Sequence, residues 1–382
     1  MNQKWKTLLI SVLTPSGIMS GIALTVLWGY FSRLDRLDVF FEVMSIKSIF
    51  VLVFLAAMLS LALLLFIFFV ISLFIPVVIP QDMNNLPAYD KIQNNLLTVL
   101  MIAGILPVIF IYIFYYVLHV SQTVKDYSGW ISMISIVLMA IIISALMTRK
   151  HLERDLSFKN RTIKWIRRGQ IYLLIPMCIA FLAHLQVFPL EIVFRNINAP
   201  DEKVNFWTLT GLAFICYMLY FVSLLPGLVY LRMDAKSNLQ KKISTSLIAS
   251  LMVLFLISTK ITVVPVIFTH AVIKFSGISD FTAHSYIIKS DEYPEEFFSN
   301  PIWEQKEIKL GKYYKIQAVS MFTTNQFNLL CPVEIIEAYR ASWKFNPWDT
   351  EFDSDVRRKL QKKASYCVPI SASALKRWDV PL

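Results

Sequence analysis

The chain has 382 residues, of which 56% are hydrophobic and only 16% are charged, and its mean hydropathy is +0.57. Soluble domains contain about a quarter charged residues, so this composition excludes an ordinary soluble protein. The formal net charge is +11, and residues 1–275 hold the whole excess, because residues 276–382 contain 14 basic and 14 acidic residues. This placement favours a membrane-topology signal over nucleic-acid binding.

Seven apolar stretches are long enough to cross a bilayer as helices, which needs about 20 residues each. The first follows Lys4 and Lys6, but it is longer than the apolar region of a signal peptide and has no small-x-small cleavage site after it. We therefore expect a retained first span. The predicted spans are 8–31, 49–80, 96–120, 130–147, 170–194, 207–231 and 245–275. Residues 1–275 are predicted to form a transmembrane helical domain.

The orientation of this domain is predicted from lysine and arginine in the short loops, which favour the cytoplasmic side. Loops 148–169 and 232–244 carry eight and four basic residues, and both follow an even-numbered span. Summed over each side, the segments that share the N-terminal side hold 15 basic residues against six on the other side. We therefore expect a cytoplasmic N-terminus and an extracytoplasmic C-terminal domain, in an integral membrane protein of a bacterial inner membrane.

Residues 276–382 change character, with mixed charges and shorter periodicity. Residues 284–290 and 308–322 alternate in the manner of β-strands, whereas residues 332–345 and 353–366 have helical patterns. A segment of this length is sufficient for a small domain with its own core. The predicted fold class is an all-α polytopic membrane protein of about seven transmembrane helices with a small C-terminal α+β extracytoplasmic domain.

The tail contains two cysteines, Cys331 and Cys367, whereas Cys178 and Cys216 lie inside predicted spans. An extracytoplasmic compartment permits disulfides, so we expect the two tail cysteines to pair. Two unrelated free thiols are the alternative.

Four ionisable residues in predicted spans five and seven are candidates for intramembrane function, because charges are rare within the hydrocarbon. They are His184, Glu191, Lys260 and His270. Lys260 lies in the stretch LISTKITVV, in the outer half of its span. It either snorkels or pairs with Glu191 to fix helix packing, or it lines a polar cavity with His184, Ser258, Thr259 and Thr262. The sequence leaves both alternatives open.

Large aromatic residues in the tail form the second group of candidates. Such residues with a charged rim are typical of interfaces that bind a protein partner, although a domain core or the membrane surface also accounts for them. The candidates for partner binding are Tyr293, Phe297, Phe298, Trp303, Trp343 and Trp348.

Catalytic and cofactor motifs are missing from the sequence. It contains no G-x-x-x-x-G-K-[ST], H-E-x-x-H, C-x-x-C or G-x-S-x-G, and its five histidines have no metal-ligand spacing. We therefore expect no cofactor, no metal site and no nucleic-acid partner.

Three functional hypotheses follow. The first is a non-enzymatic membrane protein that binds a protein partner at the outer face of the membrane, for instance as immunity against a membrane-acting toxin. The alternatives are a channel or transporter that uses the polar residues of spans five and seven, and a membrane enzyme that acts on lipid or glycan.

Overall fold

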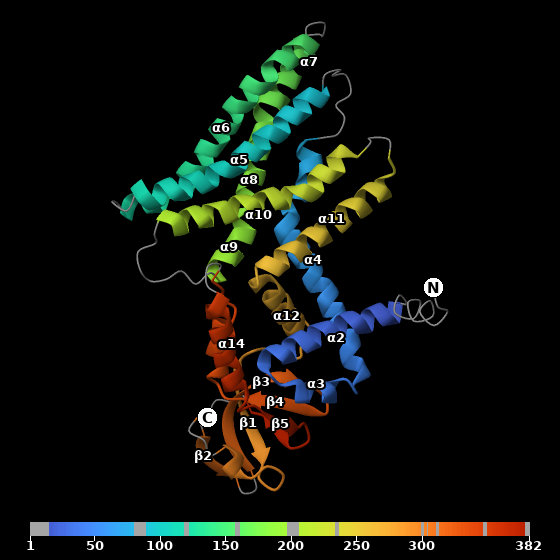
Figure 1. The fold of residues 1–382 in the computed structure, drawn as a ribbon, viewed down its shortest axis with the longest axis vertical. Helices are drawn as coiled ribbons and strands as arrows, with labels where there is room; N and C mark the ends of the chain where they lie inside the picture. The colour runs from blue at the N-terminus through green and yellow to red at the C-terminus, as the bar shows by residue number, and fades with distance from the viewer. Residues whose placement is uncertain are drawn as a thin grey trace. The chain divides into compact units, whose positions relative to one another are not determined.

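The computed structural model describes residues 15–79, 89–117, 122–156, 161–196, 206–233, 237–298, 302–303, 305–310, 313–346 and 350–378. The chain forms two compact units. We call residues 1–64, 196–198 and 260–382 the tail unit, and residues 65–195 and 199–259 the helical unit. Each unit is described by itself below, and Figure 1 labels the elements of both.

The helical unit consists of apolar helices. They are the second half of α4 (Lys47–Val78), α5 (Tyr89–Val117), α6 (Gln122–Leu156), α7 (Arg161–Gly169), the π-helix η1 (Gln170–Leu174), α8 (Ile175–Leu185), α9 (Val187–Asn196), α10 (Phe206–Arg232) and α11 (Leu239–Lys260). Helix α4 is kinked at Phe69, which has non-helical backbone angles (φ −118°, ψ 17°). The expected fifth span is likewise not one straight helix, because Gln186 separates α8 from α9.

Helices α5 and α10 pack closely at Gly104. The Tyr220 ring of α10 lies where a Cβ of residue 104 would be, so only glycine fits there. The Tyr220 hydroxyl donates a hydrogen bond of 2.6 Å to the Leu100 carbonyl, and Gln186 Nε2 donates one of 3.1 Å to the Gly104 carbonyl. The glycine therefore permits a close crossing that these buried polar side chains then fix.

Five helical segments in the described part of the chain are long and apolar enough to cross a membrane. They are Lys47–Val78, Met133–Arg154, Arg161–Leu185, Ala213–Arg232 and Leu239–Thr259. The other two expected spans correspond to α2 (Pro15–Leu34) and α5, and each of those spans includes residues outside the described ranges. The structure therefore supports an integral membrane protein, and the count of seven spans stays a prediction.

The tail unit is built on a six-stranded antiparallel sheet. Its strands are β1 (Ala283–Lys289), β2 (Gln305–Leu310), β3 (Tyr313–Thr323), β4 (Phe327–Cys331), β5 (Val368–Ser371) and β6 (Leu375–Arg377). The order is β5-β4-β3-β1-β6, and β2 pairs with β3. In the register of the central pair, Tyr286 of β1 faces Ile316 of β3.

Apolar residues of β3 alternate between two cores, as the two-residue period of a strand requires. Tyr314, Ile316 and Ala318 lie in one core, together with residues of the 290–303 segment that includes the 3₁₀-helix η2 (Glu295–Phe298). Val319 and Met321 lie in the other core, which is formed with helices. Those helices are α2, α3 (Leu37–Val43), the start of α4, α12 (Val263–Phe275), α13 (Ile335–Ala341) and α14 (Thr350–Ala364).

The compact units divide the chain differently from the boundary expected between residues 275 and 276. Residues 15–64 and 263–275 share a hydrophobic core with the sheet, so the tail unit includes segments that the sequence assigns to the transmembrane domain. Within α2, Leu27, Phe31 and neighbouring residues are buried in that core. An apolar helix face packs against a sheet for the same reason that it enters lipid, since both remove it from water.

Two local predictions from the sequence are wrong in detail. The expected seventh span, 245–275, is interrupted: α11 ends at Lys260 and α12 begins at Val263. The expected strand 308–322 is instead a hairpin, because β2 ends at Leu310 and β3 begins at Tyr313. The expected strand 284–290 and the two expected helices correspond to β1, α13 and α14.

Candidate functional site

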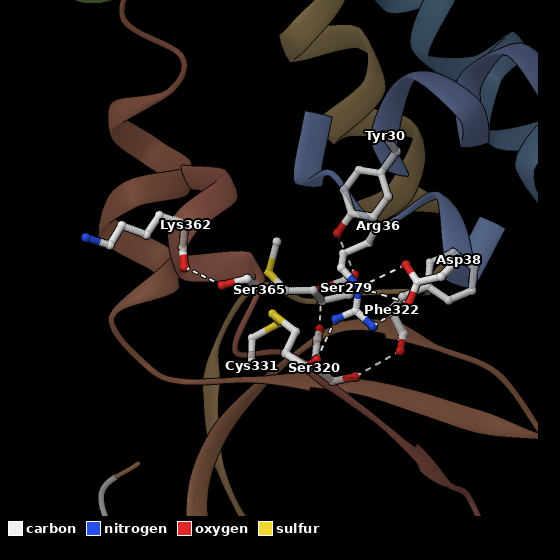
Figure 2. Close-up of a disulfide and its surroundings, with 11 residues drawn as sticks. Tyr30, Arg36, Asp38, Ser279, Ser320, Phe322, Cys331, Lys362 and Ser365 are labelled. Carbon is white, nitrogen blue, oxygen red and sulfur yellow. Dashed lines mark hydrogen bonds and ion pairs between the residues drawn. A yellow bond between two sulfur atoms is a disulfide. The ribbon is translucent and has the colours of Figure 1, made fainter. Parts of the chain in front are cut away.

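Helix α2 is attached to the sheet of the tail unit by a buried hydrogen bond. Tyr30, which is 1% exposed, donates from its hydroxyl to the carbonyl oxygen of Met321 in β3 at 2.6 Å. Figure 2 shows the Tyr30 ring pointing from α2 toward the strands. The neighbouring Phe31 ring packs 4.9 Å from that of Phe322, centroid to centroid. This contact joins residues 291 positions apart in the chain.

A disulfide lies beside this contact. Cys331 at the end of β4 is bonded to Cys367, which precedes β5, so the pairing expected from the sequence is present. The guanidinium of Arg36 donates to the Cys367 carbonyl and also binds both carboxylate oxygens of Asp38 (Figure 2). These hydrogen bonds from Arg36 hold the pKa of Asp38 below its usual value. The α2–α3 corner is thereby fixed to the disulfide.

A polar cavity of about 360 Å³ lies within the tail unit, next to the C-terminal end of α2. Its polar and charged lining residues include Arg33, Thr262, Ser342, Lys344, Asp353 and Arg357. They come from α2, the α11–α12 break, the segment after α13, and α14. The cavity is therefore assembled from four parts of the chain.

Hydrogen bonds fix most of the side chains that line the cavity. Arg33 donates to the carbonyl and the hydroxyl of Ser342, and Arg357 donates to the Ser32 carbonyl at 3.2 Å. The Asp353 carboxylate accepts hydrogen bonds from the backbone N–H of Asn346 at 3.1 Å and from the Thr262 hydroxyl at 3.3 Å.

Lys344 is different, because no partner is found for its ammonium group in the described part of the chain.

Sequence reasoning missed this cavity. Its charged residues lie in segments far apart in the chain and share no motif spacing.

The four intramembrane candidates lie on four different helices. His184 lies on α8 of the helical unit, and its buried Nδ1 has no hydrogen-bond partner among the described residues. Glu191 lies on α9, and Lys260 is the last residue of α11, but their side chains fall outside the described side chains, so their predicted pairing stays a prediction. A lysine at a helix C-terminus is favoured by the helix dipole.

The hydroxyl groups expected beside Lys260 are bonded within the protein. Ser258 and Thr259 donate to the carbonyls of Leu254 and Leu256 on their own helix, at 2.8 and 2.7 Å. Thr262 donates to Asp353 of the tail, as described above. The back-bonding of Ser258 and Thr259 satisfies both hydroxyls within their own helix, so these two contacts do not favour an ion conduit.

His270 of α12 contacts an aromatic cluster of the tail unit. Its ring centroid lies 4.4 Å from those of both Phe281 and Trp343, and the Phe281 and Tyr339 rings stack at 5.0 Å. One intramembrane candidate and one partner-binding candidate therefore pack against each other. Burial raises the pKa of Tyr339 well above its usual value, as expected for a phenol inside such a cluster.

The remaining aromatic candidates differ in their exposure to solvent. Phe298 and Trp303 are buried and form an edge-to-face pair at 4.9 Å, whereas the adjacent Phe297 is 63% exposed. Tyr293 is half-buried, and its hydroxyl accepts a hydrogen bond from the backbone N–H of Ser371 at 3.0 Å. Trp348 lies outside the described residues.

No group of three or more His, Cys, Asp or Glu side chains that could hold a metal ion occurs among the described residues. In comparisons with known proteins, no family model, curated protein or solved structure matches this chain. The functional argument therefore depends on the geometry of the tail unit.

Proposed function

We propose that this is a non-enzymatic integral membrane protein whose C-terminal domain binds a protein partner on the outer side of a bacterial inner membrane. One observation carries the proposal. Phe297 exposes 63% of its surface on a segment that buried neighbours hold in place. Large exposed aromatic side chains on a rigid support are typical of residues that dominate binding energy at interfaces.

The support of Phe297 consists of hydrogen bonds and ring contacts on both sides of it. Phe298 is fully buried against Trp303, and the Tyr314 hydroxyl donates to the Tyr293 carbonyl at 3.0 Å. The backbone N–H of Phe297 itself bonds the Pro294 carbonyl at 3.1 Å. A backbone held in this way loses little conformational entropy when its side chain binds a partner.

Four carboxylates closely precede this aromatic residue in the sequence, and their charge favours a basic partner. They are Asp291, Glu292, Glu295 and Glu296. An acidic rim around an apolar anchor is complementary to an apolar pocket with a basic rim, and like charges exclude acidic partners. We therefore propose a basic protein surface as the partner.

The orientation is supported by a parity argument within the tail unit. The C-terminal half of α2, the α3 helix, the start of α4 and the C-terminal end of α12 share one hydrophobic core with the sheet. A shared core lies on one side of the membrane. The chain that leaves this core at α4 and returns to it at α12 must therefore cross the membrane an even number of times. The five candidate spans together with α5, whose 29 residues reach about 43 Å, provide six crossings.

Loop charges favour a tail outside the cytoplasm, because the segments on the opposite side carry 15 of the 21 basic residues counted. A periplasmic reporter fused after Leu382 is expected to be active, and one inserted in loop 148–169 to be silent. The opposite pattern would refute the orientation and move the partner to the cytoplasm.

Immunity against a membrane-acting toxin is the role that we propose for such a protein. A domain on the outer side of the inner membrane would meet a toxin where it reaches that membrane. The test is to co-express the protein with any toxin gene adjacent to its own and to measure survival.

Binding is tested with a photo-crosslinking amino acid at position 297. The control is the same amino acid at position 41 of α3, because Phe41 is 68% exposed in the same unit. Crosslinks to one protein from position 297 alone, lost in the presence of excess unlabelled protein, support the proposal. Phe297→Asp should abolish protection against the toxin without lowering the protein level. Phe41→Ser should leave both protection and the protein level unchanged. Full protection by Phe297→Asp would refute the assignment.

A further inference from the structure

The cavity in the tail unit has an excess of positive charge. Arg33, Lys344 and Arg357 line it together with a single carboxylate, that of Asp353. The Asp353 oxygens accept hydrogen bonds from Asn346 and Thr262, and neither donor is a cation. The three cations therefore exceed the fixed negative charge by two, and a bound anion would compensate for this excess.

The donors suit a phosphate group. Arg33 and Arg357 each carry five N–H donors and use some of them on protein oxygens, while the Lys344 ammonium has no partner among the described residues. Guanidinium groups bind phosphate with paired N–H donors, and an ammonium adds a compact point charge. The volume of about 360 Å³ lies at the lower end of the range for small-molecule sites and is sufficient for a headgroup.

The position of the cavity along the chain places it at the membrane boundary. Thr262 follows the candidate span Leu239–Thr259 by three residues, so it lies within about 11 Å of the end of that span. The end of this candidate span is therefore close to the cavity along the chain, and lipid phosphates lie at the ends of membrane-spanning helices.

We propose that this cavity binds the phosphate group of an anionic phospholipid at the membrane surface. Basic pockets next to transmembrane helices are suited to anionic lipid headgroups. Arg33 and Arg357 hold the phosphate oxygens between α2 and α14, and Lys344 contacts them from the segment after α13. The bound lipid connects the tail unit to the bilayer. This inference does not depend on the partner-binding role of Phe297 or on which side the tail occupies.

The test uses the full-length protein purified in detergent, with phosphatidylglycerol, phosphatidylcholine or inorganic phosphate added as separate probes. Native mass spectrometry counts bound lipid, and a titration of the melting temperature gives the apparent affinity. Phosphatidylglycerol is expected to bind more tightly than phosphatidylcholine, which has the same phosphate but no net charge. Saturation by inorganic phosphate at comparable affinity would overturn the lipid assignment and identify a free-phosphate site.

Matched variants separate this cavity from general surface charge. Lys344→Gln is expected to weaken phosphatidylglycerol binding roughly five-fold, because one basic residue near a lipid surface contributes about that factor. Lys359→Gln removes the same charge from an exposed position on α14 and should have little effect. Asp353→Asn keeps an oxygen for the Asn346 N–H but removes the negative charge, so binding should tighten several-fold.

Opposite effects of Lys344→Gln and Asp353→Asn, with the Lys359→Gln variant unchanged, would support the site. Equal small effects of all three, or none, would overturn it, because the lipid would then bind elsewhere.

Discussion

Tyr30→Phe tests the central architectural observation, which is the packing of α2 on the sheet of the tail unit. The substitution removes one oxygen and preserves the ring, which is buried beside Phe31 at a centroid distance of 5.4 Å. The lost hydrogen bond is the 2.6 Å contact to the Met321 carbonyl, and both partners are buried. Because the carbonyl remains in the core without this donor, the cost includes its desolvation.

We expect Tyr30→Phe to lower the free energy of unfolding of the tail unit by about 1–3 kcal/mol, the usual range for a buried polar group left unsatisfied. For a unit of this size, this corresponds to a fall of roughly 3–9 °C in melting temperature. Tyr30→Ala also leaves a cavity, so its cost should reach about 3–5 kcal/mol.

The measurement is thermal unfolding of the purified full-length protein in detergent, with limited proteolysis of the tail as a second readout. Tyr313→Phe serves as the control, because Tyr313 is substantially exposed and its loss of a hydroxyl should change neither quantity. If Tyr30→Phe matches the wild type in both measurements, α2 does not pack on β3 as described, and the parity argument for the orientation loses its basis.

Three further predictions concern other parts of the chain. Cys331→Ser with Cys367→Ser removes a crosslink between positions 36 residues apart, which should cost roughly 4 kcal/mol and be visible as a loss of thermal stability. Gly104→Ala forces a Cβ into the Tyr220 ring, so accumulation in the membrane should fall sharply. Lys260→Met should be tolerated, at a cost of about 0.3–1 kcal/mol for the lost charge at a helix C-terminus. If Lys260 also pairs with Glu191, then Glu191→Gln alone should reduce the protein level more than the double change.

Each of these predictions has a control or a contrary outcome. Recovery of both cysteines as free thiols from fresh membranes would show that the disulfide is absent. Gly21→Ala, at a helical glycine with open space around it, should leave accumulation unchanged. Normal accumulation of the two single variants and the double variant, with function lost only when Lys260 is replaced, would show that the lysine belongs to a functional cavity.

The membrane class could be predicted from sequence because it depends on consecutive residues. The disulfide could be predicted because the tail offers only one possible cysteine pair. A bilayer requires about 20 consecutive apolar residues per helix, so a stretch such as Lys47–Val78 is recognisable without knowing its neighbours. The tail contains only two cysteines, which leaves one intramolecular pairing. The helical periods of α13 and α14 are equally local.

The candidate sites were predictable only in part. Phe297 was recognised as one of several aromatic residues, but its exposure could not be distinguished from the burial of Phe298, because short-range pattern does not show which neighbour the fold covers. The basic cavity had no signal at all, since its residues meet only after α2, α12 and α14 pack together.

What the sequence by itself determined is therefore that the chain has helices apolar and long enough to cross a membrane, and which two tail cysteines pair. Only the tertiary structure decided that α2 and α12 share a core with the sheet of the tail unit, and that α11 ends at Lys260. The physical reason is that hydropathy measures how strongly a helix avoids water and not what replaces the water. The apolar face of α2 that contains Leu27 and Phe31 has the same sequence pattern whether it meets lipid chains or the side chains of a β-sheet.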